Sequence, residues 1–336
     1  MNKINYGLIG AGRMGSFHGN TVVHQLTNAN LVAIADPFKE NADKLGKELG
    51  VSNTYADPEE LLNNPDVDAV IIATPAKTHS ELVIKAAQSK KHIFCEKPMA
   101  VTLEEADKAI EEVEKNGVKL QLGFNRRFVK SYKSGRDEVI QNNIGTPQLL
   151  RSLTRDPIIP NPEKIPEWTI FKETLIHDFD VLNYMNPNAK AIEVYTSADA
   201  LIRPDLKDKG LLDTAVVTIK YNNNAIATAE ANFQALYGYD VRTEVFGSEG
   251  MVTMGDVSSS DMKKYTNKGI AIDTTKQDTE LLHDAYVAEL NDFVNCIVYD
   301  QQPRSTGIDA KNALVIALAS IESYKQNKPI KLSEIN

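Results

Sequence analysis

Three glycines near the start of the chain have the spacing of a phosphate-binding turn. Gly10-Ala11-Gly12-Arg13-Met14-Gly15 reads G-x-G-x-x-G, follows the apolar run Ile4–Ile9 and precedes an amphipathic segment. Between a strand and a helix, the first glycine permits the tight turn, the second lets the backbone approach a pyrophosphate, and the third lets the helix pack closely on the strand. Free N–H groups at the helix start favour phosphate there. The expected dinucleotide contacts are Gly10, Gly12, Arg13 and Met14.

An acid at the end of the second apolar run indicates which dinucleotide binds. Asp36 follows Leu31–Ala35, where a carboxylate can accept the ribose hydroxyls of the adenosine and repel a 2′-phosphate. No arginine follows at once, and Lys39 is the only nearby cation. The residues therefore favour NAD, with NADP the less suitable cofactor. The alternative is that the glycines only make a tight turn and that Asp36 caps the next helix.

Polar residues also follow two further apolar runs. Thr74 follows Ala69–Ala73, and Glu96-Lys97-Pro98 follows His92–Cys95. Because the carboxyl ends of parallel strands line the ligand crevice, Thr74, Glu96 and Lys97 are expected beside the cofactor. A lysine there can exchange a proton with a substrate hydroxyl. The alternatives are a turn residue that ends a strand for Thr74 and a solvated surface position for Lys97.

A histidine flanked by acids forms a second candidate centre. If the segment around it is helical, Glu173 and His177 are i, i+4 neighbours on one face, and Asp180 lies three residues further on. A carboxylate beside an imidazole raises its basicity and fixes its orientation. A hydride-transfer enzyme needs such a base to remove the hydroxyl proton. The alternative is that these acids only cap the start of a helix.

Apolar runs alternate with helical patterns over the first 123 residues, which predicts a parallel sheet with crossover helices. Asp57 before Pro58 and Thr102 before Glu105 are helix-start signals, and Gly117 is a helix stop. The fifth apolar run of this region is Val118–Gly123. The amphipathic segments between the runs predict helices at Met14–Leu26, Lys39–Leu49, Ser80–Ser89 and Leu103–Asn116.

Strand patterns dominate after residue 123. Asn222-Asn223-Asn224 between two of them predicts a hairpin, and this half is expected to hold a mixed, largely antiparallel sheet. The strands are Gln148–Thr154, Ile192–Ala198, Thr214–Tyr221, Ala225–Phe233, Arg242–Phe246 and Met251–Met254. The helices are Thr174–Tyr184, Ala285–Val298 and Gly307–Gln326, and residues 161–166 form a loop.

Composition excludes several classes of protein. The net charge of −9 and the absence of any basic run longer than two residues argue against a nucleic-acid or anionic-membrane partner. No apolar stretch reaches the roughly 20 residues that span a bilayer. Two distant cysteines cannot form a disulfide framework, so a cytoplasmic protein is expected. No metal site is expected, because ligand spacing is absent among His18, His24, His79, His92, His177 and His283.

These residues together resemble the Gfo/Idh/MocA oxidoreductases, the group of glucose–fructose oxidoreductase and inositol 2-dehydrogenase. The resemblance runs over nearly the whole chain, and the order and spacing of its short markers make it specific. Beyond the glycine turn, Thr74-Pro75 and the EKP sequence, the markers are residues 123–128 (GFNRRF), 176–180 (IHDFD), 237–240 (YGYD), 246–250 (FGSEG) and the helix pattern from Asp309 to Ser323.

The resemblance implies an α/β fold: an N-terminal Rossmann parallel sheet followed by a C-terminal α/β domain with an open, mainly antiparallel sheet. The pattern changes at residue 123 from alternating strands and helices to mainly strands. The dinucleotide-binding domain is therefore expected at residues 1–123, and the substrate and oligomerisation domain at residues 124–336. The last helix could pack back on the Rossmann domain. The exposed face of such a sheet commonly builds homo-oligomers, either dimers or tetramers.

In inositol-dehydrogenase-like members, the EKP lysine and a histidine preceded four residues earlier by an aspartate form the catalytic set. Carried over, these are Lys97 and His177, with Glu173 in place of the aspartate. A longer acid could do the same work, shift the substrate or mark a different substrate. Asp180 is then the acid expected to support the helix of the histidine.

The same resemblance implies a set of residues around the sugar ring. The alternative for this set is structural, with the arginine in an ion pair and the tyrosines in the sheet core or at a subunit interface. Trp168 could wall the pocket, and His18 could contact the cofactor or merely cover it. The candidate substrate contacts are Arg127, Thr154, Asp156, Tyr237 and Tyr239.

The expected reaction is the reversible NAD-dependent oxidation of a secondary ring hydroxyl to a ketone, with an inositol or sugar-like polyol as the substrate. Two other classes remain. One is a sugar hydrolase or isomerase that uses tightly held NAD as a hydride shuttle. The other is a non-catalytic NAD-binding regulator, against which the presence of both Lys97 and His177 argues, because a binding module needs neither.

Overall fold

The computed structural model describes residues 3–158 and 161–335, which form two compact units. The first unit contains Met1–Asn125 and Asp284–Lys311, and the second contains Arg126–His283 and Asn312–Asn336. The division at residue 123 expected from the sequence therefore misassigns residues 284–311. The physical reason is that helix α9 (His283–Val298) buries Leu290, Phe293 and Val294 in the core of the first unit.

A six-stranded parallel sheet forms the centre of the first unit, with strand order β3-β2-β1-β4-β5-β6. The chain order reverses between β1 and β4, which is the place where doubly wound sheets bind their ligands. Four strands are buried almost throughout, as the near-continuous apolar runs predict. The strands are β1 (Ile4–Ile9), β2 (Ala29–Ala35), β3 (Asn53–Tyr55), β4 (Ala69–Ile72), β5 (His92–Cys95) and β6 (Leu120–Leu122).

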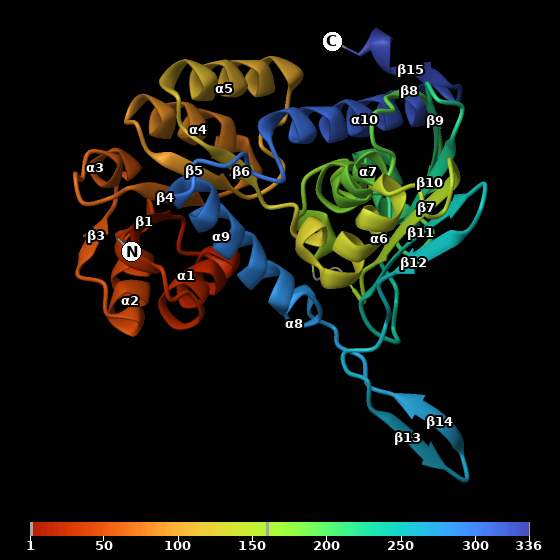
Figure 1. Ribbon diagram of the computed structural model, residues 1–336, viewed down its shortest axis with the longest axis horizontal. Coiled ribbons are helices and arrows are strands. Elements are labelled where there is room, and N and C mark those ends of the chain that lie inside the picture. The colour runs from red at the N-terminus through yellow and green to blue at the C-terminus, as the bar shows by residue number, and fades with distance from the viewer. Residues whose placement is uncertain (1–2, 159–160, 336) are drawn as a thin grey trace. The chain divides into compact units, whose positions relative to one another are not determined.

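Helices cover both faces of this sheet, with α4 and α5 on one side and α1 and α9 on the other (Figure 1). The helix signals expected from the sequence are confirmed: Asp57 accepts from the Glu59 amide, Thr102 and Glu105 form a capping box, and Gly117 ends α5 in the left-handed region. The helices are α1 (Arg13–Gln25), α2 (Lys39–Leu49), α3 (Pro58–Leu62), α4 (His79–Gln88) and α5 (Leu103–Asn116).

The second unit is built on a mixed seven-stranded sheet of order β12-β11-β7-β10-β9-β8-β15, in which β7 and β10 are parallel and the other neighbours antiparallel. The turn Asn222–Asn224 joins β9 to β10 as a hairpin, as expected. The strands are β7 (Pro147–Arg155), β8 (Ala191–Asp199), β9 (Thr214–Tyr221), β10 (Ile226–Asn232), β11 (Asp240–Gly247), β12 (Met251–Met254) and β15 (Ile330–Lys331).

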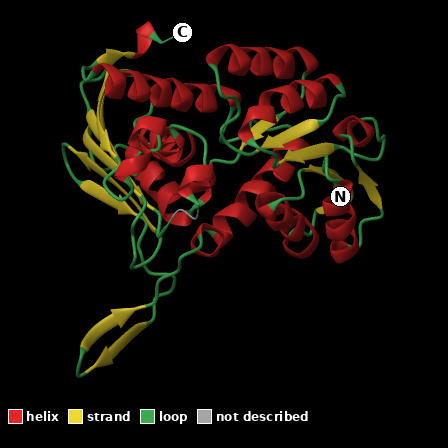
Figure 2. Cartoon of the chain, turned by 180° about the vertical axis from the view of Figure 1, so that it is seen from behind, coloured by secondary structure: helices red, strands yellow, loops and turns green. Residues whose placement is uncertain are grey.

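Only one side of this sheet is covered by helices, as the views from front and back agree (Figures 1 and 2). The helices are α6 (Lys130–Ile140), α7 (Leu175–Tyr184), which packs on β7 and β10, and α10 (Gly307–Gln326), whose first turn belongs to the first unit. The short helix α8 (Asp278–Leu281) precedes α9. Throughout the described part of the chain, every helix is too short or too polar to span a bilayer.

Several elements were not expected from the sequence. A hairpin of β13 (Lys263–Thr266) and β14 (Gly269–Ile272) projects from the second unit with all of its residues exposed (Figure 2). The strand β3, the helix α6 and the strand β15 were also missed. The loop expected at residues 161–166 contains a short 3-10 turn, Pro162–Lys164.

Candidate active site

The glycine turn of the first unit has the geometry of a dinucleotide site. Gly10 has φ +100°, and a Cβ there would stand 2.6 Å from the Ala73 carbonyl oxygen, so only glycine fits. A Cβ on Gly12 would meet nothing within 4 Å. No side chain caps α1, and no acid stands in its first turn. The N–H groups of this helix start can therefore take a phosphate, flanked by exposed Arg13 and half-buried Met14.

Asp36 lies at the end of β2 with only 8% of its surface exposed. One carboxylate oxygen accepts from the Ala11 amide at 2.8 Å, and the other accepts from the Phe38 amide at 2.9 Å. Asp36 thus braces the glycine turn and the start of α2 at once. Oδ1 also accepts from the Asn41 amide at 3.4 Å, and Oδ2 keeps a second lone pair that can accept a ribose hydroxyl, so the two expected roles of Asp36 are compatible.

A buried histidine links the ends of β4 and β5. The ring nitrogens of His79 each lie 2.8 Å from a carbonyl oxygen, Nε2 from that of Thr74 and Nδ1 from that of Pro98. Carbonyl oxygens only accept, so a ring nitrogen that carries a hydrogen donates to its carbonyl. The hydroxyl of Thr74 meets that of Thr78 at 2.8 Å. His79 therefore joins the two loops that carry Thr74 and Lys97.

Glu96 and Lys97 follow β5 directly, and the Lys97–Pro98 bond is cis. Glu96 Oε1 accepts from Nε2 of fully buried His18 at 2.7 Å, and Oε2 accepts from the Lys97 amide at 3.3 Å. Burial alone would raise the pKa of Glu96, but the hydrogen bond and charge of His18, with the charges of Lys97 and His79, lower it overall. Glu96 is therefore a carboxylate that braces half-buried Lys97, and His18 covers it from α1.

The second unit holds Glu173 and His177 on a helix with an irregular start. Ile170–Thr174 is a π-helical turn, and α7 begins at Leu175. Glu173 therefore lies in the π turn, and His177 lies in the first turn of α7. Both side chains are half-buried. Single π turns inside helices occur often at functional sites.

Two buried arginines hold the helix of His177 in place. Arg127 donates from Nε and Nη2 to the two carboxylate oxygens of Asp180 at 2.8 and 2.6 Å. Its guanidinium also lies 4.8 Å from the ring centre of Tyr184. Arg127 therefore sits in an ion pair, the structural alternative, and Asp180 supports the helix as the resemblance implied.

Asp178 is the centre of the second buried network. It accepts from Arg126 at 2.8 Å and from the hydroxyls of Ser152 and Thr154 at 2.6 Å each. Thr154 also accepts from Arg126. The hydroxyl of Thr154 is thus engaged on both sides, and the network ties β7 to α7.

The tyrosines of the second unit differ in their surroundings. Tyr239 hydrogen-bonds Asp156, and its pKa is raised well above the ordinary value, chiefly by burial and then by the Asp156 charge. Tyr237 is half exposed and donates to Asp240 at 2.7 Å. Asp240 in turn pairs with Arg242 at 2.7 Å. Tyr239 and Asp156 therefore form a polar pair, while Tyr237 belongs to a separate ion cluster.

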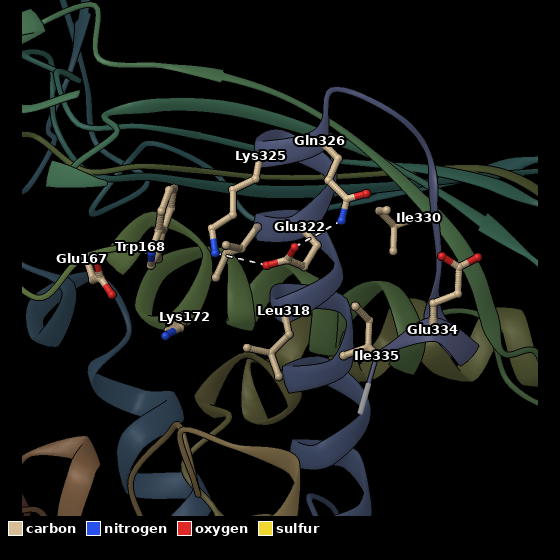
Figure 3. Close-up of a pocket in the computed structure, with 11 residues that line it drawn as sticks. Glu167, Trp168, Lys172, Leu318, Glu322, Lys325, Gln326, Ile330, Glu334 and Ile335 are labelled. Atoms are coloured by element: carbon tan, nitrogen blue, oxygen red, sulfur yellow. Dashed lines mark hydrogen bonds and ion pairs between the residues drawn. The ribbon is translucent and has the colours of Figure 1, made fainter. Parts of the chain in front are cut away.

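Trp168 lines a pocket of about 510 Å³ in the second unit (Figure 3). It has φ +62°, packs edge-on against Tyr324, and lies 5.3 Å below the Lys325 ammonium. Its neighbours in the pocket come from α10 and the C-terminal segment, including Leu318, Glu322 and Ile330. The pocket that Trp168 walls contains none of the expected substrate contacts.

Sequence reasoning missed part of each centre. His79, Arg126 and Asp178 are buried and make the hydrogen bonds that hold the expected residues, yet none was a candidate. Asp178 lies between His177 and Asp180, so the acidic cluster around the histidine was the signal that could have found it. The only cluster of three metal-type ligands within the described residues is His18, Glu96 and Glu289.

A parallel sheet of this order, with a glycine turn at β1 and an acid after β2, defines a dinucleotide-binding Rossmann domain. Residues 4–124 match the domain described as "Oxidoreductase family, NAD-binding Rossmann fold", and residues 136–332 match the C-terminal alpha/beta domain of the same family. The chain belongs to the Gfo/Idh/MocA oxidoreductase family. The resemblance, the α/β fold and the NAD-type cofactor domain expected from the sequence are confirmed.

Two relatives align over nearly the full length of the chain. A myo-inositol 2-dehydrogenase of Thermotoga maritima is 35% identical over 334 residues, covering 98% of both chains. A scyllo-inositol 2-dehydrogenase (NAD(+)) of Bacillus subtilis is 34% identical and covers 98% of this chain and 97% of its own. Among solved structures, scyllo-inositol dehydrogenase from Lactobacillus casei with bound NAD(H) and scyllo-inositol is 27% identical, with TM-score 0.93 over 99% of this chain and 100% of that one.

Proposed function

We propose that this protein oxidises a secondary hydroxyl of an inositol or a closely related polyol to a ketone, with NAD as the hydride acceptor. The observation that carries the proposal is full-length similarity, at 34–35% identity, to two inositol 2-dehydrogenases. The residues that the reaction needs stand at strand and helix ends of the two units, Lys97 after β5 and His177 in α7.

The cofactor site that we propose lies at the carboxyl ends of β1, β2, β4 and β5. Gly10, Gly12, Arg13 and Met14 would hold the pyrophosphate, and Asp36 the adenosine ribose. Thr74, Glu96 and Lys97 would surround the nicotinamide half. Bound there, NAD supplies a carbon that accepts hydride. Asp36 disfavours NADP, because a second negative charge would face a buried carboxylate.

We assign the proton chemistry to Lys97 and His177. The reaction releases one hydride from carbon and one proton from oxygen, so a base must receive the proton as the hydride leaves. The imidazole of His177 and the amine of Lys97 are both groups that can accept or donate such a proton. Glu173 orients the substrate or the imidazole, and its extra methylene places its carboxylate further from the backbone than an aspartate would.

The contacts of the remaining candidate residues separate those that we place at the substrate from those that support the helix of His177. Tyr239 and Asp156 offer a hydroxyl and a carboxylate that suit a polyol, so we place them at the substrate. Arg127 and Thr154 act through Asp180 and Asp178, which they bind, and support the helix of His177. Tyr237, half exposed beside Asp240, is assigned to the rim.

We also propose a homo-oligomer, a dimer or a tetramer, formed through the open face of the second sheet. Four exposed apolar side chains stand in register across β10, β7, β11 and β12: Ile226 (46%), Leu149 (54%), Phe246 (44%) and Met251 (50%). Contiguous apolar rows of this kind usually mark an interaction surface. The buried free thiols Cys95 and Cys296 suit a reducing, cytoplasmic setting.

The experiment that tests the function is absorbance at the reduced-nicotinamide band, with NAD or NADP and a panel of inositols and aldoses. We expect a rise with NAD and at least one inositol, and a much smaller rise with NADP. A protein that binds NAD yet reduces it with none of these compounds would contradict the proposal.

A further inference from the structure

Three titratable side chains from different elements meet in the interior of the first unit. His18 comes from α1, Glu96 from the end of β5 and Glu289 from α9, and none is more than 8% exposed. One nitrogen or oxygen atom of each lies within 4.8 Å of the others. Phe17, Phe94 and Tyr286 surround the imidazole edge-on, with ring centroids 5.4 to 6.0 Å away.

Within the described structure, Glu289 is the member of this group whose side chain makes no hydrogen bond. Both of its carboxylate oxygens, and Nδ1 of His18, are buried without a hydrogen-bond partner among residues 3–158 and 161–335. The backbone of Glu289 is fixed, because its carbonyl accepts from Nε2 of Gln121 at 2.7 Å. An ionised carboxylate in this position is strongly disfavoured. Either a cation lies beside Glu289, or the carboxyl carries a proton and is neutral.

The distance between His18 and Glu96 shows whether a metal cation or a proton neutralises Glu289. Ligands that share a tetrahedral ion at about 2.1 Å each stand about 3.4 Å apart. Nε2 of His18 and Oε1 of Glu96 stand 2.7 Å apart, which is a direct hydrogen bond. The pair is already joined through a proton at hydrogen-bond distance, which favours a proton over a metal ion as the partner that neutralises Glu289.

We propose that Glu289 is a neutral acid that lies against the buried His18–Glu96 pair and leaves Glu96 as the only carboxylate of the three-residue cluster that the imidazole serves. Glu289 is then a positioning residue: its neutral carboxyl lies beside the imidazole, the imidazole holds the Glu96 carboxylate, and that carboxylate braces Lys97. The functional half of this inference rests on the proposed role of Lys97.

The electrostatics of the two acids agree with this arrangement. Burial raises the pKa of Glu289 well above its ordinary value, and the negative charge of Glu96 raises it further. The pKa of Glu96 is lowered despite burial, because His18, Lys97 and His79 all favour its charged form. These are the charged groups facing the pair, from α1, the loop after β5 and α4. Glu96 therefore stays ionised while Glu289 keeps a proton.

The proton can be detected without any turnover. Above the ordinary glutamate pKa of about 4.3, the folded protein holds one proton that the unfolded chain has released, so raising the pH favours unfolding. Relative to E289Q, the unfolding constant of the wild type should rise about tenfold per pH unit from about pH 5 until Glu289 ionises in the folded state. The control is E111Q, which removes an exposed carboxylate from α5 of the same unit.

Urea denaturation between about pH 5.5 and 8 gives these slopes, and infrared spectra give the carbonyl stretch of a protonated acid. We expect the stretch in the wild type and E111Q and its loss in E289Q. Wild type and E289Q profiles that run parallel would overturn the proposal. So would a stoichiometric divalent metal in the purified wild type that E289Q lacks, measured by elemental analysis.

The positioning role is tested by comparing two substitutions. The amide of E289Q has the shape and polarity of a neutral acid beside His18, while E289L fills similar space without a polar group. E289Q should keep about tenfold more kcat than E289L, with the Kd for NAD similar in both. Equal kcat in the two variants would refute positioning. If the protein oxidises no polyol at all, the proposed function fails, but the denaturation slopes still decide the state of Glu289.

Discussion

Asp180→Asn tests whether Arg127, which binds the helix of His177, has a structural role. In the native protein, Arg127 donates to both carboxylate oxygens of Asp180 at 2.8 and 2.6 Å. The two side chains are 5% and 1% exposed. The substitution keeps the shape of Asp180 but removes the negative charge, so the guanidinium remains buried without a matching anion in this pair.

The expected cost follows from that burial. Breaking a buried ion pair by removing one partner costs about 3–5 kcal/mol. Tyr184, whose ring centre lies 4.8 Å from the guanidinium, continues to stabilise the cation. We therefore expect the lower end, about 3 kcal/mol, which corresponds to roughly a 150-fold rise in the unfolding constant.

Urea denaturation followed by circular dichroism measures this change. The matched control is Asp205→Asn, because Arg203 donates to Asp205 with the same two-pronged geometry at 2.9 and 2.7 Å. That pair is exposed, at 45% and 59%, so its loss should hardly move the midpoint.

Two results would contradict a structural role for the Arg127–Asp180 pair. If D180N unfolds at the same urea concentration as D205N, burial does not make the pair important. The double variant R127M/D180L should recover most of the lost stability, because apolar side chains of similar volume can replace a buried pair. A double variant that is stable but inactive would show instead that Arg127 contacts the substrate.

Three further outcomes follow from the proposed function. Lys97→Met should lower kcat about 10²- to 10⁴-fold with little change in the Kd for NAD, measured by steady-state kinetics and fluorescence titration; full turnover would exclude Lys97 from the proton chemistry. Asp36→Asn should raise the ratio of kcat/KM with NADP to that with NAD about tenfold or more, because a hydrogen bond to a charged group and a repulsive charge are both lost; an unchanged ratio would contradict the assignment of Asp36. Ile226→Lys with Phe246→Glu should reduce the sedimenting mass to that of a smaller species, while Leu236→Lys, at a still more exposed apolar position off the sheet, should not.

The sequence predicted most of the first sheet because its strands are short apolar runs between amphipathic helices. Local patterns failed where the local signal is weak. Helix α6 buries only Tyr132, Gly135 and Val139, and Gly135 is there because the Met254 side chain occupies the space of a Cβ. The hairpin β13–β14 is exposed on both faces, so it shows no alternation of apolar and polar residues.

The candidate residues could be found from the sequence, but their environment could not. Glycine spacing and strand ends point to Gly10, Asp36 and Lys97, since these features are local. The partner of Arg126 lies 52 residues away in Asp178. Only the folded chain shows which of several nearby acids an arginine meets.

The discontinuous first unit has a consequence for how the protein is made. Its core is incomplete until Leu290, Phe293 and Val294 of α9 have joined it, and α9 follows the whole of residues 126–283 in the chain. At roughly 5–20 residues per second, a ribosome takes about ten to thirty seconds to produce that insertion. During that interval, the apolar surface of β1 and β5 that packs on α9 is exposed. This surface includes Tyr6 and Phe94, which contact Phe293 in the folded protein. The nascent chain therefore exposes an apolar surface that the finished protein buries under α9.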